Sequence, residues 1–80
     1  QYGMRKLKEM RMRNCNSLKN VSMIENHLFP HLRVMKIHFA DYMKSFEMDS
    51  STLEDLCIDH CEELEIVRLK CPNLVYLDLK

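Results

Sequence analysis

The sequence predicts a solenoid of short parallel β-strands, because two features recur along it in register. The first is an apolar motif, L-x-x-L-x-L with Met, Ile, Val or Phe also allowed, which occurs seven times between Leu7 and Leu79. The second is a small residue, Cys or Ala, that follows alternate motifs at a fixed distance. The last three positions of each motif alternate apolar, polar, apolar, which is the period of a strand with one buried face.

Two successive motifs form one longer unit, and the units begin near Leu7, Leu32, Leu53 and Leu74. The periods are therefore 25, 21 and 21 residues. Within a unit the pattern reads L-x-x-L-x-L-x-x-C-x-x-L, and the second motif starts on the last of these residues. Leucine-rich repeats have this pattern and lengths of ~20–29 residues. We therefore expect a leucine-rich-repeat solenoid, in the α/β class by family but β-rich here, forming a right-handed coil of about 3.5 repeats.

The first motif of each unit predicts one strand of a short-stranded parallel sheet. In each strand the two apolar residues point inward, and the residues that flank them point outward. The expected strands are Met10–Met12, Met35–Ile37, Leu56–Ile58 and Leu77–Leu79.

The second motif of each unit forms the return leg of the coil. It has the same alternation, so we expect it to be extended or a loose turn at 21–23, 46–48 and 67–69. A short helix with Leu18, Val21, Met23 and Leu28 on one face is the alternative for the first unit, which is also the longest. The pattern does not decide between the two.

Cys15, Ala40 and Cys61 occupy the small position, where the chain turns away from a strand. A small buried side chain suits this position because neighbouring coils stack closely there. The chain has seven methionines and one glycine, unlike a loop-rich disulfide scaffold. We interpret its four cysteines as free thiols of a reducing compartment, cytoplasmic or nuclear.

Zinc binding is the alternative for the cysteines, because Cys57, His60 and Cys61 form a C-x-x-H-C cluster that Cys71 follows. Zinc favours four Cys or His ligands in tetrahedral geometry. The spacing matches structural zinc sites poorly, and Cys57 is expected to face outward while Cys61 is buried. We expect no metal and no other cofactor.

Charge and composition exclude several classes of function. The net charge is zero, but residues 1–20 carry six basic residues against Glu9, and residues 41–65 carry nine acidic residues against Lys44. The acidic half would repel phosphates, so no nucleic acid is expected as a partner. No apolar run approaches the ~20 residues that span a bilayer, so no membrane is expected either. A single glycine and no phosphate-binding loop indicate that the chain is not an enzyme.

Two segments resemble repeats of a known family: Leu53-Glu54-Asp55-Leu56-Cys57-Ile58-Asp59-His60-Cys61 and Cys71-Pro72-Asn73-Leu74-Val75-Tyr76-Leu77-Asp78-Leu79. They are similar to the repeats of plant F-box/leucine-rich-repeat proteins over about residues 7–80. The resemblance implies the substrate-recognition part of a ubiquitin ligase adaptor, although these residues contain no F-box. Plant nucleotide-binding disease-resistance receptors have similar repeats, and Phe29-Pro30-His31-Leu32-Arg33-Val34 fits them equally well. We expect residues 1–80 to be a single piece of a longer parent chain, with truncated termini.

The candidate site is the outward face of the predicted sheet, expected to be the concave face of the solenoid. Solenoids use such extended faces to recognise other proteins, so the expected partner is a protein. The alternative is that this face is solvated surface and the contact lies elsewhere in the parent chain. Tyr76 is the expected aromatic anchor, because Tyr is enriched in interface hot spots. The face comprises Glu9, Arg11, Arg13, Val34, Lys36, His38, Asp55, Cys57, Asp59, Tyr76 and Asp78, with Lys80 at its end.

Overall fold

The computed structural model describes residues 6–80, apart from the side chains of Ser22 and Met23. These residues form seven strands and no helix, so the described part of the chain has no helix that could cross a membrane. The strands are β1 (Glu9–Arg13), β2 (Asn20–Ile24), β3 (Val34–His38), β4 (Ser45–Asp49), β5 (Asp55–Asp59), β6 (Ile66–Lys70) and β7 (Tyr76–Leu79).

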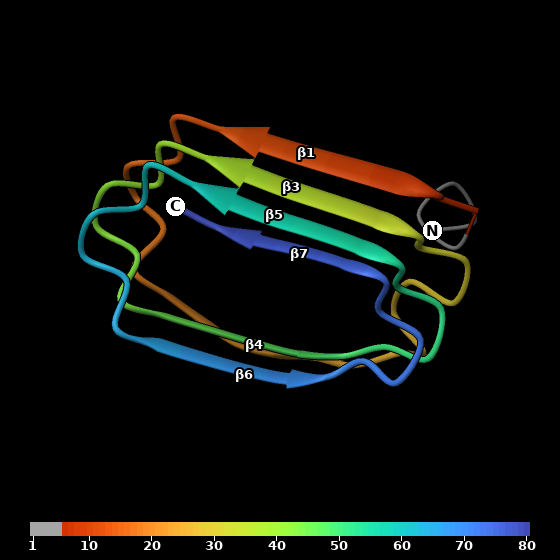
Figure 1. The fold of residues 1–80 in the computed structure, drawn as a ribbon. Coiled ribbons are helices and arrows are strands. Elements are labelled where there is room, and N and C mark those ends of the chain that lie inside the picture. Colours follow the sequence, from red (N-terminus) through yellow and green to blue (C-terminus); the bar gives the residue numbers. More distant parts are fainter. Residues whose placement is uncertain (1–5) are drawn as a thin grey trace.

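The strands build two parallel sheets that lie opposite one another (Figure 1). The odd-numbered strands form a four-stranded sheet in the order β1-β3-β5-β7, and the even-numbered strands form a three-stranded sheet in the order β2-β4-β6. The chain alternates between the sheets, which gives three full coils and the first strand of a fourth. The predicted β-rich solenoid with a short-stranded parallel sheet is confirmed.

The return legs are strands, so the helical alternative for Leu18–Leu28 is wrong. Val21 is buried in β2, which pairs with β4, whereas Leu28 lies in a turn and is nearly half exposed. Five residues connect β4 to β5 and five connect β6 to β7, but nine, residues 25–33, connect β2 to β3. The extra length of the first unit is therefore a longer loop and not a helix.

The core lies between the two sheets and follows the predicted alternation. Met35, Ile37, Leu56 and Ile58 of the four-stranded sheet are buried, as are Phe46 and Met48 of the three-stranded sheet. The leading residues Leu32, Met43 and Leu53 are also buried, which confirms that they pack inward from the turns.

The end coils bury their apolar residues less completely than the sequence predicts. Met10 and Met12 are half-buried, and Cys15, which we expected to be buried, is half-buried as well. Cys61 occupies the same position two coils further on and is buried. The difference has a simple cause: a solenoid buries its apolar face by stacking coils, and the first described coil has a neighbour on one side.

The corner after each odd-numbered strand repeats in backbone detail. Asn14, Phe39 and His60 directly follow β1, β3 and β5, and all three have positive φ, between 54° and 58°. Each donates its N–H to the next coil, Asn14 to the His38 carbonyl at 3.0 Å and Phe39 to the Asp59 carbonyl at 3.0 Å. The residue with the left-handed conformation thus ends one strand, and the small residue that follows it is part of the core at Ala40 and Cys61.

Candidate functional site

The strand register assembles the predicted site residues into straight columns on the outward face of the four-stranded sheet. The first column is Glu9, Val34, Asp55 and Tyr76; the second is Arg11, Lys36, Cys57 and Asp78; the third is Arg13, His38 and Asp59. Lys80 continues the third column, since its carbonyl accepts from His60 N at 3.2 Å and its N–H donates to the Ile58 carbonyl at 2.9 Å. All twelve residues therefore lie on one continuous surface.

Burial divides this surface into a centre and two flanks. The centre is formed by β3 and β5, whose six outward residues are all half-buried between neighbouring strands. On the flanks Glu9, Arg11, Arg13 and Tyr76 are exposed. The most covered part of the face is therefore its centre, and Tyr76 lies at the margin of that centre.

Several carboxylates of the face lie beside a basic or imidazole side chain. Glu9 pairs with Arg11 on β1, and Asp78 Oδ2 lies 3.5 Å from Lys80 Nζ. Asp59 interacts with two histidines: its Oδ2 lies 3.4 Å from His38 Nδ1, and its Oδ1 contacts His60.

Three charged residues of the outward face have no ionic partner among residues 6–80. Arg13 and Lys36 form no ion pair with any carboxylate of residues 6–80. Asp55 Oδ1 is buried and has no hydrogen-bond partner there. A buried acceptor without a donor is unfavourable by roughly 1–3 kcal/mol, so a partner that brings a donor to Asp55 would remove that penalty.

An aromatic pair borders the third column, and the sequence reasoning missed it. The rings of Phe39 and His60 stack with centroids 4.8 Å apart, and Arg13 Cζ lies 5.7 Å from the centre of the Phe39 ring. Arg13 therefore interacts with a ring face and not with a carboxylate. The sequence did contain a signal for this pair, because Phe39 and His60 occupy the same position of the repeat, directly after a strand, as Asn14 does in the first coil.

Three of the four thiols have a raised pKa. All four cysteines are free. Burial raises the pKa of Cys57, and the nearby carboxylates of Asp78 and Asp59 raise it further. Burial also raises the pKa of Cys61 and of Cys71. Because the thiolate is the nucleophilic form, these shifts oppose thiol catalysis at neutral pH.

The proposed zinc ligands do not converge. Cys57 lies on the outward face between Lys36 and Asp78, whereas Cys61 belongs to the core between the sheets. Within residues 6–80 no group of three His, Cys, Asp or Glu side chains is placed to hold a metal ion. The C-x-x-H-C spacing is a consequence of the repeat, which sends its first cysteine outward and its last inward.

Comparison with known proteins found no match: no family model, no curated protein and no solved structure matches the chain.

Proposed function

We propose that the outward face of the four-stranded sheet binds a protein partner. The observation that carries this proposal is the register, which aligns four strands without a shift and stacks their outward residues into columns. Solenoids of this kind offer extended, rigid surfaces for recognition. The half-buried centre, the unpaired Arg13 and Lys36, and the unsatisfied Asp55 give the face both shape and charge specificity.

The partner chemistry follows from the unpaired charges. Arg13 and Lys36 lie on β1 and β3, and Asp55 lies on β5, so the positive and negative groups are on different strands. A complementary protein surface would place a carboxylate over β1 and β3 and a hydrogen-bond donor or cation over β5. Such complementarity orients the encounter and suppresses wrong partners more than it adds affinity.

We further propose that the coils are leucine-rich repeats and that they hold the substrate of a cytoplasmic or nuclear ubiquitin ligase adaptor. This proposal is supported by the likeness of 53–61 and 71–79 to repeats of plant F-box proteins. Ligand sensing by a disease-resistance receptor is the second candidate, supported by the Phe29–Val34 segment. An F-box in the parent protein would favour the first candidate, and a nucleotide-binding domain would favour the second.

The experiment compares two matched sets of charge reversals in the full-length protein, against the partner recovered with it by affinity purification. The test set is Arg13→Glu with Lys36→Glu, and the control set is Lys19→Glu with Lys44→Glu, two exposed lysines that precede β2 and β4. We expect the test set to weaken binding by roughly tenfold or more, which corresponds to ~1.4 kcal/mol. Equal effects of both sets, with folding intact by circular dichroism, would show that this face is not the binding surface.

A further inference from the structure

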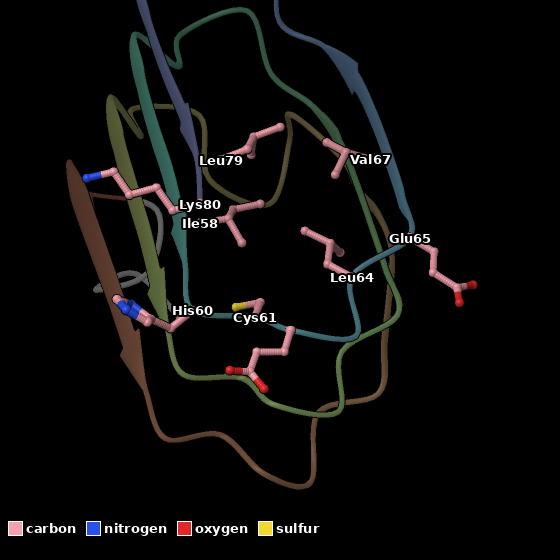
Figure 2. A pocket seen from close by; sticks show the side chains of 9 residues that line it. Ile58, His60, Cys61, Leu64, Glu65, Val67, Leu79 and Lys80 are labelled. Carbon is pink, nitrogen blue, oxygen red and sulfur yellow. The ribbon is translucent and has the colours of Figure 1, made fainter.

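The cavity that Figure 2 shows lies at one end of the solenoid and has apolar walls from both sheets. Its volume is about 590 Å³, and Leu79, Ile58 and Val67 border it. Phe46, which pairs with Val67 one coil earlier, is buried between the sheets. The cavity therefore has the form of a further half-coil, and the repeat alone accounts for it.

A second cavity opens on the outward face of the four-stranded sheet, where β1, β3 and β5 begin. Its volume is about 370 Å³. The first residue of each of these strands and the residue before it form the lining: Lys8, Glu9, Arg33, Val34, Glu54 and Asp55. Asp55 lies on β5, between β3 and β7, so both of its neighbouring strands are present.

The backbone carbonyls that border this cavity are occupied, but one side-chain acceptor is not. The Lys8 carbonyl accepts from Arg33 N at 2.8 Å and from Val34 N at 3.1 Å. The Arg33 carbonyl accepts from Glu54 N at 2.8 Å and from Asp55 N at 3.0 Å. The Arg33 guanidinium donates to Glu54 Oε1 at 2.9 Å. Asp55 Oδ1 is buried and has no hydrogen-bond partner among residues 6–80.

Asp55 differs in this respect from the other carboxylates of the outward face. Each of those has a basic or imidazole side chain beside it: Glu9 has Arg11, Asp59 has His38 and His60, and Asp78 has Lys80. Within residues 6–80 no such side chain lies within ion-pair distance of Asp55. Its register neighbours are Val34 and Tyr76, which carry no charge at neutral pH. The charge of Asp55 is therefore left for a group from outside.

We propose that Asp55 and the cavity beside it form a subsite for an arginine side chain of the protein partner. The inference rests on the function proposed above and adds the chemistry that the partner carries at one position. A guanidinium offers a planar set of N–H donors that matches a carboxylate with two parallel hydrogen bonds, and it also packs against aromatic rings. Asp55 provides the carboxylate, with Val34 on one side and Tyr76 on the other. Binding supplies the donor that the buried oxygen lacks, which is where the gain arises.

The probe is an acetylated and amidated tripeptide with arginine between two glycines. It is titrated into the protein, and the backbone amide resonances of Val34, Asp55 and Tyr76 report binding. A second tripeptide carries citrulline, which has nearly the shape of arginine but no charge. A third carries lysine, which has the charge but not the planar pair of donors. We expect saturable shifts of the three amides with arginine, binding about tenfold weaker with citrulline, and binding roughly threefold weaker with lysine.

The variant Asp55→Asn keeps the shape of the side chain and removes its charge. It should weaken binding of the arginine peptide about tenfold, because the charge-assisted hydrogen bonds are lost. Its urea midpoint should stay equal or rise, because the substitution removes a partly buried charge that has no partner in the fold. The matched control is Asp49→Asn, an aspartate of the same half-buried class on β4 of the other sheet. It should leave peptide binding within about twofold.

Three results would overturn the proposal. One is equal binding of the arginine peptide and either of the other two peptides. Another is an equal effect of Asp55→Asn and Asp49→Asn on binding. The third is a lower urea midpoint for Asp55→Asn, because the carboxylate would then already have its donor within the fold.

The failure of this subsite and the failure of the proposed binding face give different results. If the reversals at Arg13 and Lys36 weaken the partner but the arginine peptide does not bind, the face stands and the subsite is wrong. If the peptide binds at Asp55 but those reversals act no more than their control, the subsite stands and the proposed face is wrong.

Discussion

Phe39 and His60 stack across neighbouring coils with their ring planes 19° apart, and both residues have left-handed backbone conformations, at φ 58° and 54°. The two facts are connected. Each residue ends a strand of the four-stranded sheet at the same repeat position, so the left-handed turn that redirects the chain also places the two rings one above the other. The stack offsets part of the strain, which for a residue with a Cβ atom costs roughly 1–2 kcal/mol.

The corner predicts a clear difference between two substitutions of His60. Both His60→Asn and His60→Val remove the ring, but Asn tolerates the left-handed region and a β-branched residue does not. We expect His60→Val to lower the free energy of unfolding by ~1–2 kcal/mol more than His60→Asn does. Urea denaturation followed by circular dichroism measures the difference. Equal losses would show that the corner relaxes to another conformation.

The small corner position predicts unequal tolerance of size and charge. Cys61→Ala should change the free energy of unfolding by less than about 1 kcal/mol, because Ala40 already occupies the equivalent site with no exposed surface. Cys61→Arg should cost about 3–5 kcal/mol, since it buries an unpaired charge. Cys15→Arg, at the half-buried end coil, is the control and should cost far less. Thermal or urea unfolding of the three variants measures these losses. Equal losses for Cys61→Arg and Cys15→Arg would show that burial of the corner does not set the cost.

The stacking of coils predicts a gradient of sensitivity along the solenoid. Ile37 is fully buried in the second coil, so Ile37→Ala should cost about 2–5 kcal/mol. Leu79 occupies the same repeat position at the end of β7 but is half exposed, so Leu79→Ala should cost roughly 1 kcal/mol or less. Urea midpoints measured at equal protein concentration test the gradient. Similar losses at both positions would mean that the end coil is as well covered as the centre.

The raised thiol pKa values predict a loss of stability at high pH. Burial raises the pKa of Cys61 above its ordinary value of 9.0, and it raises that of Cys71 in the same direction. A group whose folded-state pKa is raised stabilises the fold below the unfolded-state pKa, and this contribution is lost as the pH rises through the folded-state value. The urea midpoint should therefore fall above about pH 9.

The variant Cys61→Ala provides the control for this pH dependence, since it removes one of the titrating thiols and leaves the corner geometry. Its midpoint should fall less steeply above that pH than the midpoint of the unaltered chain does. The same shifts predict that iodoacetamide reacts more slowly with Cys61 than with a cysteine in an unfolded peptide at pH 8, because less thiolate is present. Reaction at the peptide rate would indicate that the corner opens readily.

The sequence alone determined the coil period, the direction of the strands and the membership of the outward face. The motif L-x-x-L-x-L repeats so regularly from Leu7 to Leu79 that its alternation indicates the buried face of every strand. The columns follow directly, because parallel strands with equal patterns align equal positions. Cys57 and Cys61 were correctly assigned to opposite faces for the same reason.

The tertiary structure decided the features that depend on contacts between coils: the conformation of the return leg, the burial of each cysteine and the stacking of aromatic rings. The return leg at Val21 became a strand because β4 offered it a partner, whereas its local pattern also suited a helix. Cys15 and Cys61 share a repeat position, but one is half-buried and the other buried, since burial requires a coil on each side. The Phe39–His60 stack joins residues 21 positions apart, and a local pattern in the chain does not encode contacts of that kind.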